Sequence, residues 1–127
     1  MGNMYFAVGM GGAIGAILRF LIYKWFLLAE NIPIMGTLFV NLSGCFFLGC
    51  LQGLARTYHL PNWIVVGIGT GVIGAYTTFS TFSVEVITYF KHGIFLLPIM
   101  YLLVSSIGGY LFVYLGFSLT RWESKGV

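Results

Sequence analysis

The sequence predicts an all-α integral membrane protein with four transmembrane helices. Of its 127 residues, 59% are hydrophobic and only 7% are charged. A chain so poor in charge cannot cover the surface of a soluble domain with groups that hold water. Four apolar stretches reach the length of about 20 residues that a helix needs to cross a bilayer. We therefore expect residues 1–127 to form a single four-helix transmembrane domain, with spans near residues 4–24, 33–55, 62–90 and 95–120.

The first span, near residues 4–24, contains Arg19 close to its end and no acidic residue. No basic segment precedes it, and its apolar stretch is too long for the core of a cleavable signal peptide, so we expect a permanent span. Gly11 and Gly15 have the GxxxG spacing that lets helix backbones approach closely. The same spacing recurs in the second and third spans, where it indicates tight packing rather than a function.

The second span, near residues 33–55, offers a polar face. Thr37 and Asn41 lie one turn apart in the stretch GTLFVNLSG, so they share that face. A buried asparagine amide supplies two donors and an acceptor, which suits a binding site. A hydrogen bond to a neighbouring helix explains Asn41 equally well. Cys45 and Cys50 fall on different helix faces, so we interpret them as small apolar side chains and not as a disulfide or a metal site.

The third span, near residues 62–90, contains the most unusual stretch, GVIGAYTTFSTFSVE at 71–85. Glycine and β-branched threonine both disfavour the helix, which predicts a break near residues 74–78. A break inside a membrane leaves backbone carbonyls and amides without helical partners, and such carbonyls suit a small hard cation such as Na⁺. A continuous helix whose hydroxyl groups bond back to the preceding turn is the alternative.

Two phenylalanines and an acid accompany the hydroxyl groups of this stretch. If the chain is helical from Ser80 onward, Phe79 and Phe82 share one face, and Thr81 and Glu85 lie on a neighbouring stripe. The edge of a phenyl ring carries partial positive charge and can contact an anion without trapping it, whereas plain packing is the alternative explanation of the pair. Glu85 is the only acid within a span, which favours a functional role, and a position near the helix end in contact with water is equally open.

The fourth span, near residues 95–120, ends before Arg121 and places Tyr101 and Ser105 one turn apart. Together with Asn41 and the hydroxyl groups of the third span, these side chains make a candidate lining that is mostly neutral. Such a lining suits an ion that passes along hydrogen-bond donors better than a substrate held by salt bridges.

The cations are distributed almost evenly over the two sides of the membrane. The N-terminal side holds Arg56, Arg121 and Lys125, and the other side holds Lys24 and Lys91, plus Arg19 if it reaches outward. The positive-inside rule orients a protein through a clear excess of cations, and none is present. We therefore predict insertion in both orientations and an antiparallel dual-topology homodimer, with orientation by one or two charges as the alternative.

Three blocks of the sequence resemble the signatures of the CrcB/Fluc family of fluoride channels, namely GGAIGAILRF at 11–20, GTLFVNLSGCFFLG at 36–49 and GVIGAYTTFSTFSVE at 71–85. The resemblance covers essentially the whole chain. It implies a multi-pass protein of the bacterial inner membrane that exports fluoride passively through two pores of an antiparallel homodimer. Besides its second copy, fluoride and the lipid bilayer, we expect no nucleic-acid partner and no organic cofactor.

The same resemblance assigns eight residues to the fluoride pore: Asn41, Phe79, Phe82, Ser80, Thr81, Tyr101, Ser105 and Glu85. It implies that the two phenylalanines line the path with their ring edges and that Asn41 contacts the ion. It places Arg19 near a pore entrance, where a cation attracts anions. It also implies a structural Na⁺ on the dimer axis, held by the main-chain carbonyls of Gly74 and Thr77.

Two other functions remain as alternatives. A dual-topology small-molecule or multidrug exporter has the same size and layout, but such exporters rely on a membrane-embedded carboxylate in the first span, and residues 4–23 contain none. A non-transporting accessory subunit would explain the glycines and the hydrophobicity but not the polar third span. We do not expect an enzyme, because the sequence has no set of nucleophile, base and orienting group and no cluster of metal ligands.

Overall fold

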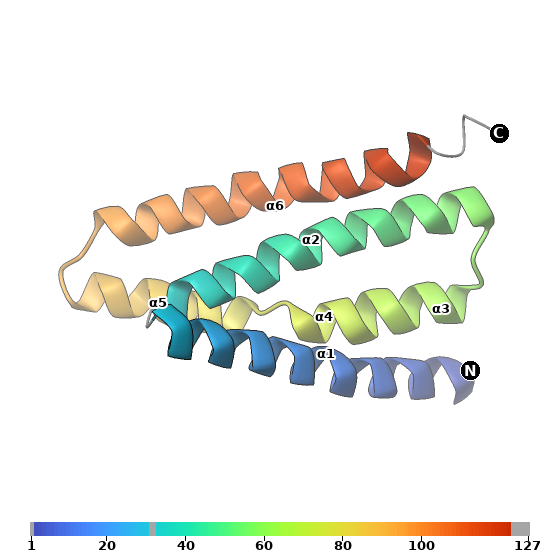
Figure 1. Cartoon of the computed structure of the whole chain (residues 1–127), viewed down its shortest axis with the longest axis horizontal. Coiled ribbons are helices and arrows are strands. Elements are labelled where there is room, and N and C mark those ends of the chain that lie inside the picture. Colours follow the sequence, from blue (N-terminus) through green and yellow to red (C-terminus); the bar gives the residue numbers. More distant parts are fainter. Residues whose placement is uncertain (1, 31–32, 123–127) are drawn as a thin grey trace.

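The computed structural model describes residues 2–30 and 33–122, and this part of the chain is helical apart from its connections (Figure 1). The elements are α1 (Gly2–Glu30), α2 (Pro33–Tyr58), α3 (Asn62–Val66), the π-helix η1 (Gly67–Ile73), α4 (Gly74–Tyr76), α5 (Phe79–Lys91) and α6 (Leu96–Trp122). They make up four segments long and apolar enough to cross a membrane, at Gly2–Leu28, Pro33–Tyr58, Asn62–Lys91 and Leu96–Arg121. The prediction of an all-α, multi-pass membrane protein with four transmembrane helices is confirmed for the described residues.

Helix α1 continues past the predicted end of the first span, as far as Glu30. The prediction stopped near Lys24 because a charged side chain often marks the membrane surface. The residues that follow, 25–28, are all apolar and continue the helix. A lysine can lie within such a span because its long stem packs on apolar surface while its ammonium group reaches toward water.

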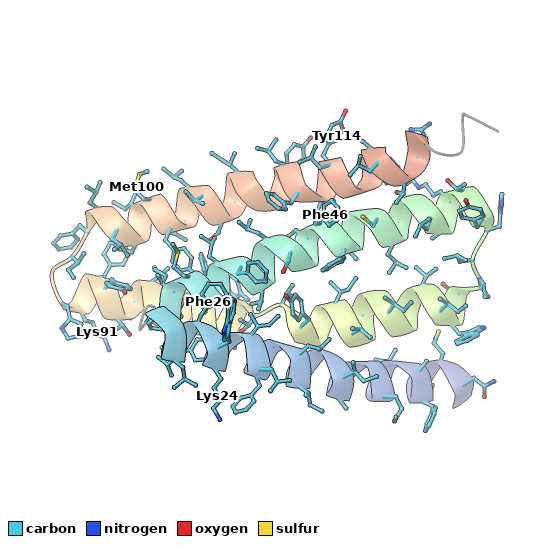
Figure 2. All side chains as sticks on the ribbon, viewed as in Figure 1. Lys24, Phe26, Phe46, Lys91, Met100 and Tyr114 are labelled. Atoms are coloured by element: carbon cyan, nitrogen blue, oxygen red, sulfur yellow. The ribbon has the colours of Figure 1, made fainter. Side chains whose placement is uncertain are left out.

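The helices run in alternating directions, so the described cations other than Arg19 lie toward the two ends of the bundle (Figure 1). Arg56 and Arg121 occupy the last turns of α2 and α6 at the end where α1 begins. Lys24 and Lys91 belong to the opposite end (Figure 2). Lys125, which the sequence assigned to the first of these ends, lies outside the described residues.

Glycines allow close helix contacts at the predicted GxxxG pairs. A Cβ atom on Gly49 of α2 would meet the carbonyl group of Val113 in α6. A Cβ atom on Gly15 of α1 would meet the carbonyl group of Val72 in η1. Because the neighbouring atoms are backbone, they cannot move aside as a flexible side chain does. These contacts hold α1 against the third span and α2 against α6.

Replacing Gly15 by Ala is therefore expected to lower the thermal unfolding midpoint of the protein in detergent micelles. Overpacking of this kind costs about 1–3 kcal/mol. Gly12→Ala is the matched control on the same helix, because a Cβ atom there meets nothing within 4 Å. Its midpoint should be unchanged or slightly higher, since alanine favours the helix. Equal midpoints for the two variants would contradict the contact between α1 and η1.

The third span changes its backbone geometry along its length. Gly67–Ile73 forms the π-helix η1, a rare element that is frequent at functional sites. Between α4 and α5, Thr77 has φ −75° and ψ 158° and Thr78 has φ −144° and ψ 124°, so both are extended. We call these two residues the Thr77–Thr78 link. Helical hydrogen bonds cannot run through extended residues, so backbone groups near the link need other partners.

Candidate functional site

Asn41 on α2 supplies hydrogen-bond partners to the Thr77–Thr78 link. Its Nδ2 donates to the carbonyl of Thr78 at 3.0 Å, and its Oδ1 accepts from the N–H of Thr78 at 2.8 Å. One amide thus satisfies both backbone groups of a residue that is 7% exposed. Without such partners, each buried group would cost about 1–3 kcal/mol. The link is therefore held by a side chain from a different helix.

The hydroxyl group of Thr78 caps the start of α5. Its Oγ1 accepts from the N–H of Thr81 at 3.2 Å and donates to the hydroxyl of Thr81 at 3.1 Å, and the hydroxyl of Ser80 lies 3.3 Å away. Threonine is a favoured N-cap because it satisfies one of the free amides of a first helical turn. The two hydroxyl residues assigned to the pore, Ser80 and Thr81, are thus connected to the link.

The other two hydroxyl residues of this stretch donate to backbone carbonyl groups four residues earlier. Thr77 donates to the carbonyl of Ile73 at 3.0 Å, and Ser83 donates to the carbonyl of Phe79 at 2.8 Å. If the third span were a continuous helix, all of its hydroxyl groups would be expected to make this kind of bond to an earlier carbonyl. It applies to Thr77 and Ser83, but not to the cluster around Thr78.

A first cavity of about 390 Å³ lies beside the link, and residues of five helical elements line it. Its lining includes four of the predicted pore residues, Asn41, Phe79, Phe82 and Ser105, together with Thr78. The Oγ of Ser105 is buried and has no hydrogen-bond partner. A buried hydroxyl group without a partner indicates a place for water or for an ion that accepts a hydrogen bond.

The two phenyl rings of the predicted pore differ in their surroundings. Phe82 is 9% exposed and its ring lies 4.7 Å from that of Tyr101, centroid to centroid. Phe79 is 81% exposed, and its ring lies 6.1 Å from that of Phe82 with 35° between the planes. Packing accounts for part of the Phe82 environment. It does not account for the exposure of Phe79, which borders the open side of the cavity.

A second cavity of about 220 Å³ also has Thr78 in its lining, together with Arg19, Thr37, Ser80 and Thr81. Thr78 lines both cavities, so they adjoin at the link. Arg19 donates from one of its terminal nitrogen atoms to the carbonyl of Thr77 at 3.3 Å. The arginine that the family resemblance assigns to a pore entrance is therefore also bonded to the backbone of the link.

Glu85 is hydrogen-bonded to two buried hydroxyl groups from other helices. Thr37 donates to its Oε1 at 2.8 Å, and Tyr101 donates to its Oε2 at 3.0 Å. Thr37 and Tyr101 are 1% and 5% exposed. The sequence left open whether Glu85 simply meets water near the end of its helix, and these contacts tie it to the interior instead.

The carbonyl groups of Gly74 and Thr77 fit the oxygen chemistry that a sodium ion prefers. The N–H that would serve the Gly74 carbonyl in a regular helix is that of Thr78, and it bonds to Asn41 instead. The Thr77 carbonyl already accepts from Arg19. Within residues 2–30 and 33–122, no group of three histidine, cysteine or acidic side chains could hold a metal ion.

Sequence reasoning missed three residues around the site. Cys45, interpreted as a small filler, lines the first cavity. The hydroxyl groups of Ser43 and Tyr76 lie 2.9 Å apart, and Tyr76 is buried directly before the link. The signal available in the sequence was the position of Ser43, two residues after Asn41, but its partner is 33 residues away.

Known proteins resemble this chain over most of its length. The model of the family described as CrcB-like protein, Camphor Resistance (CrcB), matches residues 6–117. A relative from Moorella thermoacetica, named fluoride-specific ion channel FluC 2, is 44% identical over 86% of this chain and 89% of its own length. Relatives of the same kind from Listeria monocytogenes and Bacillus cereus are 45% and 39% identical, over 89% and 91% of this chain and 88% and 82% of their own lengths.

These relatives are named as ion channels, which agrees with the expectation that the chain is not an enzyme. The match covers all three sequence blocks at 11–20, 36–49 and 71–85 and every predicted pore residue. The chain therefore belongs to the CrcB-like protein family.

Proposed function

We propose that this protein is a passive, fluoride-selective ion channel of the bacterial inner membrane. The observation that carries the proposal is the pair of adjoining cavities at the Thr77–Thr78 link, lined by an amide, hydroxyl groups and phenyl rings. The names of the relatives support fluoride as the ion. Nothing in the described lining would hold a substrate by several salt bridges.

Fluoride is small and strongly hydrated, so its removal from water is very costly. A pore must replace that hydration with short-range donors and still release the ion. In our proposal the ion enters past Arg19 and moves along the hydroxyl groups of Ser80, Thr81 and Thr78. It then passes the ring edges of Phe79 and Phe82, whose partial positive charge attracts an anion weakly.

Ser105, Tyr101 and Glu85 would continue the polar path along α5 and α6. The unpartnered hydroxyl of Ser105 can donate to the ion. Tyr101 donates to Glu85 at 3.0 Å. Glu85 also accepts a hydrogen bond from Thr37, which lines the second cavity. We propose that the carboxylate orients these hydroxyl groups, because an anionic group repels a halide that approaches it directly.

The function requires a second copy of the chain. The first cavity is open on the side of Phe79, and Gly74 at the same opening is exposed. An antiparallel copy would cover this opening, place a partner's ring beside the path and yield two pores for each dimer. The balance of Arg56 and Arg121 against Lys24 and Lys91 supports insertion in both orientations.

Dual topology predicts that a single cysteine added at the C-terminus reacts with a membrane-impermeant maleimide from both faces of the membrane. The measurement needs a background in which Cys45 and Cys50 are replaced by alanine. Intact cells should label about half of the tagged chains, and permeabilised cells should label all of them. Labelling from one face alone would rule out the antiparallel dimer.

A sodium ion on the dimer axis would be held by the carbonyl groups of Gly74 and Thr77 from both copies. The ion would supply a fixed positive charge between the pores. Arg19, which bonds to the Thr77 carbonyl, would orient that carbonyl. Dimers dialysed into a buffer with a bulky organic cation should unfold at a lower temperature than dimers in sodium buffer. Equal midpoints in the two buffers would exclude a structural role for the ion.

The alternative of a multidrug exporter lacks the membrane-embedded carboxylate that it would need, because the first span, Gly2–Leu28, contains no acidic residue.

The function can be tested by expressing the protein in a bacterium that lacks its own fluoride exporter. We expect growth at fluoride concentrations that stop the parent strain, with no change in tolerance to cationic drugs. If fluoride tolerance is unchanged while the protein is present in the membrane, the proposed function is wrong.

A further inference from the structure

The end of α4 makes a second contact with α2, next to the contact between Asn41 and Thr78. Tyr76 is the last residue of α4, directly before the Thr77–Thr78 link, and it is 8% exposed. Its phenolic oxygen lies 2.9 Å from the hydroxyl oxygen of Ser43 on α2. Ser43 follows Asn41 by two residues, so two neighbouring side chains of α2 hold the chain directly before the link and within it.

The direction of the hydrogen bond between the two hydroxyl groups follows from the protons that are available. A serine hydroxyl has one proton and two acceptor lone pairs. The Oγ of Ser43 lies 2.6 Å from the carbonyl oxygen of Phe39 and 3.4 Å from that of Val40, and a carbonyl oxygen can only accept. The proton of Ser43 is therefore used on α2 itself, and the phenol of Tyr76 donates to Ser43. Two hydrogen bonds in series thus connect Tyr76 to the backbone of α2.

Close packing reinforces this contact. A Cβ atom on Gly44, the residue after Ser43, would meet the side-chain methyl group of Thr77 and would lie 3.4 Å from the Cδ1 of Tyr76. The lack of a side chain at position 44 thus lets α2 lie directly against the end of α4. A buried phenol that lost its partner inside a membrane would find no water to replace it. Both packing and hydrogen bonding therefore fix the position of Tyr76.

The helical hydrogen bonds of the third span stop at Thr77, so the position of the link depends on side chains (Figure 1). The N–H and the hydroxyl group of Thr77 both donate to the carbonyl of Ile73 at 3.0 Å. The next N–H, that of Thr78, bonds to Asn41 and not to the carbonyl of Gly74. Beyond Thr77, contacts with other helices replace the helical pattern.

We propose that Tyr76 and Ser43 are positioning residues of the ion path. Neither residue is part of the lining of the two cavities at the link, so neither is expected to touch the ion. Thr77 and Thr78, which follow Tyr76 directly, do line the first cavity. The pair fixes the place of the link and thereby keeps the path narrow enough to exclude chloride. This inference rests on the proposed channel function, but the position of the link can be measured without any ion flux.

Amide hydrogen exchange of the purified full-length protein, followed by mass spectrometry, tests the positioning. Tyr76→Phe keeps the ring and removes the donor. We expect the amides of residues 77–78 to exchange about fivefold faster, the effect of one lost hydrogen bond on a local opening. Tyr110→Phe is the matched control, because it removes a phenolic hydroxyl group at a position that is 73% exposed. Exchange at the link that is equal in these two variants would overturn the proposal.

A double-mutant cycle tests whether the two residues act through each other. Tyr76→Phe and Ser43→Ala remove the same hydrogen bond, so the double variant should exchange no faster than either single variant. Ser43→Thr keeps a hydroxyl group and should exchange as slowly as the unchanged protein. Ser83→Ala should also leave the link unchanged, because the Ser83 hydroxyl donates to a carbonyl of its own helix. Additive effects of the two single changes would contradict the pairing.

Liposome efflux connects the position of the link with selectivity. We expect Tyr76→Phe to release chloride and so to lose part of the preference for fluoride, while Tyr110→Phe keeps the preference of the unchanged protein. A purely structural role would lower the thermal unfolding midpoint and leave the ratio of fluoride to chloride release unchanged, which would overturn the proposal. If the unchanged protein releases no fluoride, the proposed function is wrong, and the exchange measurement alone decides whether the pair positions the link.

Discussion

Replacing Asn41 by Leu is expected to abolish fluoride flux and to lower the thermal unfolding midpoint. The leucine fills a similar volume but removes both hydrogen bonds to the backbone of Thr78, at 3.0 and 2.8 Å. Each buried backbone group left without a partner costs about 1–3 kcal/mol, and the link is expected to rearrange to satisfy them. Flux is measured with a fluoride electrode on liposomes that contain the purified variant.

Gln52→Leu is the matched control for this experiment. It makes the same change from amide to leucine on the same helix, but at an exposed position. We expect its flux and unfolding midpoint to equal those of the unchanged protein. If Asn41→Leu conducts as well as Gln52→Leu and unfolds at the same temperature, Asn41 neither holds the link nor contacts the ion.

Phe82→Ile is expected to reduce fluoride flux about tenfold or more, which corresponds to a barrier higher by about 1.4 kcal/mol. Isoleucine remains apolar and nearly fills the site, but it has no ring edge to contact an anion. The Phe82 ring lines the first cavity and lies against Tyr101, at 4.7 Å between centroids. The variant should therefore keep the elution volume of the unchanged protein in size exclusion while its flux falls.

Phe90→Ile is the control on the same helix, since the Phe90 ring pairs with Phe95 at 5.9 Å and is not part of either cavity lining. Its flux should be unaffected. Phe79→Ile provides an independent comparison, because Phe79 is exposed and its loss removes little packing within the chain. A fall in flux for Phe79→Ile with no change in unfolding midpoint would assign that ring to the ion path. Full flux in both Phe79→Ile and Phe82→Ile would mean that the two rings only pack within the protein and do not contact the ion.

The sequence was sufficient for the fold class because membrane insertion depends on local composition. Hydrophobic length alone predicted the four spans, and a helix satisfies its own backbone in lipid. Helix α1 extends beyond the predicted span end near Lys24, because the apolar residues 25–28 continue the helix. A single cation is a weak signal for a helix end, since its side chain can reach toward the surface from several residues inside.

The polar residues of the candidate site were identifiable from the sequence, but their partners were not. Glycine and threonine indicated poor helix formation near residues 74–78, whereas the contact of Asn41 with Thr78 connects residues 37 positions apart. The same holds for Glu85 with Thr37, which are separated by 48 positions. Spacing along one helix predicts shared faces. It does not predict which faces of two helices meet, because that depends on the packing of the whole bundle.

Arg19 illustrates the same limit for a charged side chain. The family resemblance implied a position near a pore entrance for this cation. Its hydrogen bond to the Thr77 carbonyl, at 3.3 Å, involves a residue 58 positions away. This contact gives Arg19 a structural role at the link in addition to the expected attraction of anions. Ser105 was predicted as a pore residue. The sequence did not predict that its hydroxyl group is buried without a hydrogen-bond partner.

The most direct measurement compares fluoride and chloride efflux from liposomes that hold the purified protein, with the membrane voltage set by potassium and an ionophore. A path of neutral donors and ring edges predicts rapid release of fluoride and retention of chloride within the same preparation. Equal release of the two halides, or no release of fluoride above that of protein-free liposomes, would contradict a fluoride-selective path at the Thr77–Thr78 link.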